Sequence, residues 1–305
     1  MLITANESFL GPDAVCVREE VRRRRAFFDV REVFRGGAYC SFEHLLGQER
    51  ALARGLLAVL ALLRRHRLEP LPLSRYYLYR PTDADHGGFH SRHAHGFRYL
   101  DLVGYAVAIT DAEIGASVRA LDALRAYVHD CIHNATYRTF RRGPDGRIFR
   151  EQYGFNFRRW NGLSYSPARQ TACGSINLNL LMDGIVVLKT AELLSHRSIA
   201  AFARARTPAE RMLVADVRAE LEEIGPQCPS WSFHQSVTNP TLEFLERYDS
   251  PALMEALYRA MLTGQIREAA ELMRRLSGRG WRDLFMSSAF SSAPGPRPEE
   301  EARAA

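Results

Sequence analysis

Two histidines four residues apart are the residues whose types and spacing most directly suggest chemistry. They lie in the segment His129-Asp130-Cys131-Ile132-His133. In a helix, positions i and i+4 lie one above the other on the same face, so two imidazoles at this spacing are able to share one metal ion. The acid that follows the first histidine is placed to reach a metal-bound water. The pattern therefore predicts a helical metal site with hydrolytic chemistry.

The surrounding sequence predicts that this motif is helical. Thr110-Asp111-Ala112-Glu113 has the pattern of a capping box, and apolar residues follow at steps of three or four up to Ile132. Residues 175–194 predict a second buried helix, which contains Asp183. Because burying a carboxylate without a partner is costly, Asp183 is expected to have one. A metal ion shared with the histidines is one such partner, and an arginine or a backbone donor is another.

The two predicted helices resemble those of the zincin metallopeptidases, whose HExxH helix binds zinc. Here the motif reads HDxxH. In the gluzincin branch a second helix supplies the third ligand, and Met182-Asp183-Gly184 stands in a comparable place. The resemblance implies a Zn²⁺ ion bound by His129, His133 and Asp183. It also implies a zinc-dependent peptidase or related amide hydrolase.

Catalytic roles also follow from the resemblance. Asp130 would be the general base, and His234 would stabilise the oxyanion, a role for which Tyr153 and Tyr165 are alternatives. Asp is one methylene shorter than the Glu of the family, a loss of roughly 1.5 Å in reach. This departure puts the role of Asp130 in question.

A second carboxylate competes for the position of third ligand. Glu192 lies nine residues after Asp183 (192 − 183), which at about 100° per residue places the two on opposite faces of one helix. Both cannot face the metal, and the sequence leaves the choice open.

Composition is typical of a globular protein: 305 residues, 46% hydrophobic and 25% charged, with a net charge of +6. Lys189 is the only lysine, and the arginine excess supports nucleic-acid binding only weakly, so we do not expect a nucleic-acid partner. Five scattered cysteines favour reduced thiols and a cytoplasmic location. We find no secretory signal, and the apolar stretch 55–63 is too short to cross a membrane.

The remaining pattern predicts an α+β fold that is predominantly helical, with a zincin-like helix pair and a small antiparallel sheet. A hairpin is expected over 137–161 around Gly143-Pro144-Asp145-Gly146. The predicted helices lie at about 17–27 and 42–67, from a capping box at Thr207, and from about 240, 251 and 265, with His234 in a loop before 240. We expect one globular region, 1–286, with an N-terminal sub-domain 1–70, a metal-site core 71–235 and a helical part 236–286. Residues 287–305 are expected to be a disordered tail.

Three functions fit these residues. The first is the zinc hydrolase, acting on a peptide or protein. The second is a non-haem Fe²⁺ oxygenase, because two histidines and one carboxylate also form its facial triad. The third is a non-enzymatic helical binding protein with structural histidines, which would contact an anionic partner through Arg22–Arg25 and the histidine-rich segment His86–His95. The oligomeric state is not predicted.

Overall fold

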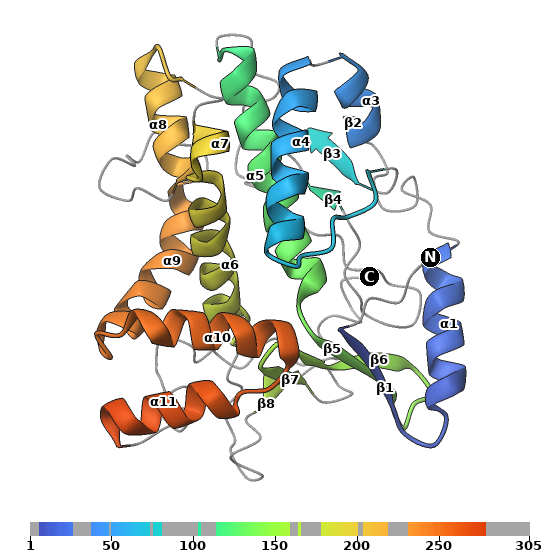
Figure 1. The fold of residues 1–305 in the computed structure, drawn as a ribbon. Coiled ribbons are helices and arrows are strands. Elements are labelled where there is room, and N and C mark those ends of the chain that lie inside the picture. Colours follow the sequence, from blue (N-terminus) through green and yellow to red (C-terminus); the bar gives the residue numbers. More distant parts are fainter. Residues whose placement is uncertain are drawn as a thin grey trace, which may run out of the picture.

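The computed structural model describes residues 6–26, 38–48, 50–73, 76–80, 103–104, 114–158, 164–165, 178–200, 204–218 and 231–278. Its helices are α1 (Ala14–Ala26), α3 (Phe42–Gln48), α4 (Arg50–Arg65), α5 (Ala116–Ala135), α6 (Asn179–Leu194), α7 (Arg197–Ala200), α8 (Pro208–Val217), α9 (Trp231–Glu246), α10 (Pro251–Thr263) and α11 (Arg267–Ser277). Its strands are β1 (Glu7–Leu10), β2 (Ala38–Ser41), β3 (Tyr77–Arg80), β4 (Val103–Gly104), β5 (Arg138–Arg142), β6 (Ile148–Tyr153), β7 (Asn156–Arg158) and β8 (Ser164–Tyr165). The chain is therefore a predominantly helical α+β protein, as the sequence predicts (Figure 1).

Helix α5 lies at the centre of the helical layer and packs against α4, α6 and α8 (Figure 1). Neither glycine nor proline interrupts it, and its apolar side chains recur at steps of three or four. The buried residues that follow this spacing are Val118, Leu121, Leu124, Val128 and Ile132. Burying a side chain of this size contributes roughly 1.5–3 kcal/mol. The burial of this face fixes the rotation of α5 about its axis, and with it the direction of His129 and His133.

A glutamate of α8 fixes the start of α5. Thr207 and Glu210 form the predicted capping box, in which the Glu210 backbone N–H donates to the Thr207 hydroxyl over 3.1 Å and the Glu210 carboxylate accepts from the Thr207 N–H. The same carboxylate accepts a hydrogen bond of 2.8 Å from the N–H of Gly115, directly before α5. The capping box predicted at Thr110–Glu113 lies outside the described residues, and α5 begins at Ala116.

Helix α6 packs between α5 and α9, while α10 crosses the lower ends of these helices and packs on α11 (Figure 1). Buried residues from Phe42 to Met273 form one contiguous hydrophobic cluster. The division into 1–70, 71–235 and 236–286 stays a prediction, and the predicted tail 287–305 lies outside the described residues.

The larger sheet lies beside the C-terminal end of α5 (Figure 1), and its strand order is β1-β5-β6-β7-β8. The predicted hairpin is present as β5 and β6, and the pairs from β5 to β8 are antiparallel. Strand β1 pairs with β5 in parallel, so the sheet is mixed rather than purely antiparallel. Helix α1 packs on β1 and β5, where Val17, Val21, Phe140 and Ile148 form a second buried cluster.

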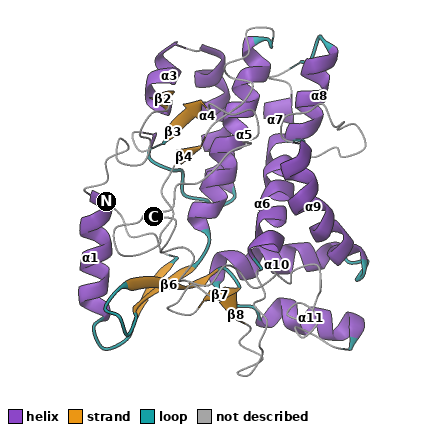
Figure 2. Ribbon diagram, turned by 180° about the vertical axis from the view of Figure 1, so that it is seen from behind, coloured by secondary structure: helices purple, strands orange, loops and turns teal. Residues whose placement is uncertain are grey.

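A smaller sheet, β2-β3-β4, lies beside α3, α4 and α5, away from the C-terminal end of α5 (Figure 2). Near it, three buried aromatic rings join the chain segments around α5. The ring centroids of Phe42 and Tyr127 are 5.2 Å apart in a stacked arrangement, and Tyr76 contacts both rings edge-on. Through Tyr127 the motif helix is thus packed against the aromatic side chains of Phe42 and Tyr76.

The helix expected over 42–67 is described as α3 and α4, and residue 49 between them lies outside the described residues. One predicted boundary is wrong. Helix α9 begins at Trp231, so His234 lies in a helix and not in the predicted loop, and Pro240 lies inside the helix rather than at its start. Within the part of the chain that the structure describes, no helix has the length and apolar character needed to cross a membrane.

Candidate functional site

The two histidines of the motif lie together on the C-terminal half of α5, as their spacing predicts. Their Nε2 atoms are 3.0 Å apart, and their ring centroids are 4.6 Å apart at an interplanar angle of 67°. His133 is buried, whereas His129 is half-buried. Both imidazoles therefore direct the same nitrogen to one point beside the helix.

Asp183 comes to this point from α6. Its Oδ1 lies 3.5 Å from Nε2 of His133, and its side chain is 36% exposed, although Met182 and Ile185 on the same helix are buried. Water thus reaches the carboxylate directly. The packing of α6 on α5 brings together residues that are fifty positions apart (183 − 133).

These separations are compatible with a bound metal ion. Tetrahedral zinc with bonds of about 2.0–2.1 Å holds neighbouring ligand atoms roughly 3.3 Å apart. The separation between the two Nε2 atoms, 3.0 Å, and that between His133 Nε2 and Asp183 Oδ1, 3.5 Å, both lie close to this value. Across the described ranges, no group of three or more His, Cys, Asp or Glu side chains is already arranged to hold a metal ion.

The competing carboxylate, Glu192, lies elsewhere on α6. Its Oε2 accepts a hydrogen bond of 2.7 Å from Nζ of Lys189, which also pairs with Glu255 of α10. The two glutamates raise the pKa of Lys189 and outweigh the effect of its partial burial. Asp183 therefore lies beside His133, whereas Glu192 is paired within α6 to Lys189, the residue that links α6 to Glu255 of α10.

Asp130 lies in the core, with a side chain that is 2% exposed. Burial raises its pKa well above the usual range of an aspartate, and the Tyr76 hydroxyl partly opposes that shift. Cys131 is a further buried neighbour, and its own pKa is raised to about 12 by burial. Asp130 thus occupies the aromatic cluster near Tyr76 and Tyr127, an environment that favours its neutral form.

Of the three candidates for oxyanion stabilisation, the structure describes the side chain of one, Tyr153. His234 lies in α9, which packs on α6, and its side chain is outside the described part of the structure. Tyr165 lies in β8, and its side chain is likewise not described. Tyr153 is described fully: its hydroxyl oxygen is 2.8 Å from Nδ1 of His133 and also donates to the His133 carbonyl oxygen over 3.3 Å.

The surroundings of Tyr153 are buried and positively charged. The Arg150 guanidinium lies over the tyrosine ring, 4.0 Å from its centroid. Burial raises the pKa of Tyr153, and the charges of Arg150 and Arg138 partly oppose that shift. The hydroxyl therefore stays protonated across the physiological range.

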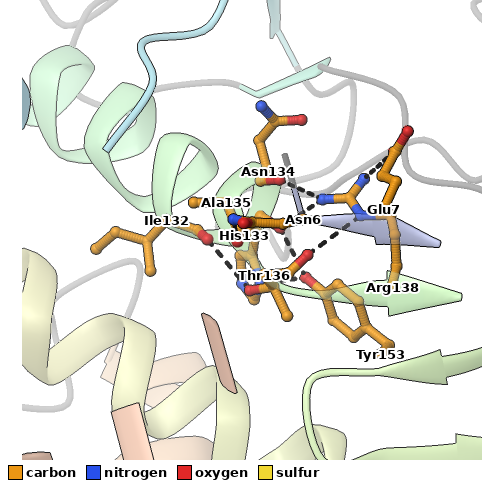
Figure 3. A network of polar contacts seen from close by, with 9 residues as sticks. All are labelled: Asn6, Glu7, Ile132, His133, Asn134, Ala135, Thr136, Arg138 and Tyr153. Carbon is orange, nitrogen blue, oxygen red and sulfur yellow. Dashed lines mark hydrogen bonds and ion pairs between the residues drawn. The ribbon is translucent and has the colours of Figure 1, made fainter. Parts of the chain in front are cut away.

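A buried arginine holds the end of α5 (Figure 3). Arg138 donates to the carbonyl oxygens of Thr136 over 3.2 Å, His133 over 3.1 Å, and Asn134. Its guanidinium also lies 3.7 Å from the carboxylate of Glu7, and both side chains are almost fully buried. A cation at a helix C-terminus satisfies carbonyl groups that lack partners within the helix and is favoured by the helix dipole.

Asn6 completes this cap by donating to the carbonyl oxygen of Ala135 (Figure 3). No local sequence pattern marks Asn6 or Arg138 as capping residues. Asn6 comes from a segment 129 residues earlier in the chain than Ala135. The contact between Tyr153 and His133 likewise has no local sequence signal.

We compared the chain with protein-family models, with curated proteins and with solved structures, and found no significant match in any of the three comparisons.

Proposed function

We propose that this protein is a metal-dependent hydrolase of amide bonds, in which His129, His133 and Asp183 hold one divalent cation. The observation that carries the proposal is that Nε2 of His133 lies 3.5 Å from Oδ1 of Asp183 and 3.0 Å from Nε2 of His129. Two imidazoles and one carboxylate are the donor set of many catalytic zinc sites, which keep one position open for the reaction. We therefore propose Zn²⁺ as the cation.

The chain supplies the remaining groups. A cation bound here would polarise the scissile carbonyl group and activate water for attack. The resemblance implies Asp130 as the general base, but its carboxyl group is buried beside Tyr76, where the neutral form is favoured. Because a neutral carboxyl group does not accept a proton, we assign no proton-transfer step to Asp130. The Tyr153 hydroxyl is already engaged by His133, so we assign oxyanion stabilisation to His234. The proposed substrate is a peptide or protein, and the proposed location is the cytoplasm.

Two other functions have a specific observation in their favour. The same three donors would suit Fe²⁺ in an oxygenase, since they form a 2-His-1-carboxylate set. Structural histidines are favoured by the partners of His133, because its two ring nitrogens already lie close to Tyr153 Oη and His129 Nε2. Bound iron together with oxygen consumption would identify the oxygenase, whereas bound zinc would favour the hydrolase. Absence of metal binding would favour structural histidines.

The test is a titration of metal-free, full-length protein with Zn²⁺ in competition with a chromophoric chelator. The wild type is expected to bind one equivalent. His129→Ala and Asp183→Asn should weaken binding by more than the roughly ten- to hundredfold that loss of an outer-shell partner causes. Glu192→Gln is the matched control on the same helix and should bind like the wild type, because Glu192 pairs with Lys189.

Hydrolysis is measured in parallel on unstructured protein substrates and peptide libraries. Activity should disappear with a chelator and return with Zn²⁺. A wild-type protein that takes up no divalent cation would contradict the proposal, as would binding that depends on Glu192 rather than on Asp183.

A further inference from the structure

Tyr153 lies behind His133, on the side of the imidazole opposite the candidate cation site. Its hydroxyl oxygen is 2.8 Å from Nδ1 of His133, while Nε2 of the same ring faces His129 and Asp183. The tyrosine and histidine rings are nearly parallel, with an interplanar angle of 20° and centroids 6.2 Å apart. Both side chains are buried, so the contact is shielded from bulk water.

The protons of this contact determine which nitrogen of His133 is able to bind a cation. A phenolic hydroxyl has one proton to donate and lone pairs with which to accept, and a neutral imidazole carries one N–H. The Tyr153 hydroxyl lies 2.8 Å from Nδ1 of His133 and 3.3 Å from the His133 carbonyl oxygen, and it also interacts with the Thr136 side chain. The carbonyl oxygen accepts only. If the hydroxyl donates to it, Nδ1 is free to donate to the hydroxyl oxygen.

When the Tyr153 hydroxyl donates to the His133 carbonyl oxygen, Nδ1 of His133 carries the proton of the imidazole. Nε2 then presents a lone pair toward His129 and Asp183. In the opposite arrangement the hydroxyl donates to Nδ1, and the proton on Nε2 blocks coordination. We propose that Tyr153 is a positioning residue of the cation site: it holds the ring of His133 and accepts its Nδ1 proton, so that Nε2 is the coordinating atom. This inference rests on the proposed metal-dependent function.

A hydroxyl in this place differs from the carboxylate that often supports a metal-binding histidine. An ionised carboxylate only accepts, whereas the hydroxyl is able to accept or donate. His133 is therefore able to exchange its tautomer between the cation-free and the cation-bound protein while its ring stays in place. The 3.3 Å contact with the His133 carbonyl oxygen gives the hydroxyl proton an acceptor in the bound state.

The fold holds Tyr153 firmly enough for this role. The Arg150 guanidinium covers one face of its ring. Directly after it, Gly154 takes a φ of +55° and donates a 2.7 Å hydrogen bond from its N–H to the Tyr137 carbonyl oxygen. An added Cβ at Gly154 would lie 2.5 Å from Sδ of Met182, so the turn packs closely against the residue before Asp183. The same turn thus contacts both sides of the proposed site.

The test compares Tyr153→Phe with Tyr137→Phe, a matched control that also removes one phenolic hydroxyl. The Tyr137 hydroxyl donates to Ser8 over 3.1 Å, so its loss should leave His133 unaffected. Tyr153→Phe should weaken Zn²⁺ binding about ten- to hundredfold, as loss of an outer-shell partner does, while Tyr137→Phe should bind like the wild type. Denaturant unfolding of both variants separates an effect on the site from a general loss of stability.

A second measurement needs no variant. In ¹⁵N spectra of the zinc-loaded wild type, His133 should show a protonated Nδ1 that exchanges slowly with solvent and an Nε2 without a proton. Equal Zn²⁺ affinity of Tyr153→Phe and the wild type would overturn the inference while leaving the proposed function intact. Coordination through Nδ1 would overturn it as well. Failure of the wild type to bind Zn²⁺ is a different result, which removes the proposed function and this inference together.

Discussion

Replacing Arg138 by methionine should lower the free energy of unfolding by about 3 to 5 kcal/mol, the range seen when one partner of a buried ion pair is removed. The structure accounts for this size. Arg138 is 2% exposed and donates to three carbonyl groups at the end of α5. Its loss also leaves the carboxylate of Glu7, whose side chain is 1% exposed, without the guanidinium that faces it. Methionine fills a similar volume, so little of the effect comes from a cavity.

The assay is equilibrium unfolding in urea, followed by circular dichroism. Arg141→Met is the matched control on the same strand, because Arg141 pairs with Glu151 over 3.0 Å at the surface, with side chains 44% and 23% exposed. An exposed pair of this kind contributes about 0–1 kcal/mol. The double variant Arg138→Met with Glu7→Gln should recover part of the loss, since the remaining group is then neutral.

The reasoning is refuted if Arg138→Met and Arg141→Met lower stability equally, or if Glu7→Gln makes Arg138→Met less stable still. Zn²⁺ affinity gives a second readout of the same variant. Because Arg138 holds the carbonyl group of His133, its loss should also weaken cation binding, whereas Arg141→Met should not.

Three further predictions concern stability and reactivity. Gly154→Ala should destabilise the protein by about 2–4 kcal/mol in urea unfolding, because it combines a positive φ with a Cβ placed against Met182; a loss below about 0.5 kcal/mol would show that the turn relaxes freely. The pKa of Glu210 is lowered in the folded protein, chiefly by hydrogen bonds from backbone N–H groups, so its contribution to stability is present above about pH 4.5 and is lost as the pH falls further. Acid unfolding curves of Glu210→Gln should therefore be flatter in that range than those of the wild type. Burial raises the pKa of the Cys131 thiol to about 12, so alkylation mapped by mass spectrometry should modify exposed Cys16 quickly and Cys131 only on unfolding; equal rates would contradict the packing of α5.

Local patterns predicted the parts of the fold that local physics determines. The capping box at Thr207 and Glu210 is present because the cap bonds lie within one turn of α8. The turn Gly143–Gly146 is present because its residues favour the required dihedral angles, with Gly146 at a φ of +77°. The histidine pair follows from helical periodicity in the same way, since four residues span about one turn.

Features that depend on contacts distant in sequence were not predicted. Strand β1 joins β5 in parallel across 131 residues (138 − 7), and no turn signal connects them. Helix α9 continues through Pro240, although proline within a helix usually lies in the first turn. This helix packs closely on α6, a tertiary contact that the local sequence does not reveal. Local propensity is a weak guide where tertiary packing decides.

In the candidate site, too, local patterns predicted some features, and the others depend on tertiary contacts. Periodicity alone left Asp183 and Glu192 as alternatives, because it fixes their relative angle on α6 but not which face meets α5. In the structure Lys189 pairs with Glu192, while Asp183 lies beside His133, and this arrangement favours Asp183 as the proposed ligand. The contact between Tyr153 and His133 depends on the register of β5 with β6, which shifts between Thr139 and Phe140, and no sequence pattern reveals such a shift.

The most direct test of the metal site is a crystal structure of the full chain grown with Zn²⁺, with diffraction recorded at energies on both sides of the zinc absorption edge. The account predicts one strong anomalous peak between α5 and α6, about 2.0–2.2 Å from Nε2 of His129, Nε2 of His133 and one oxygen of Asp183. Crystals without a peak at this place, or with zinc coordinated by Glu192, would contradict it.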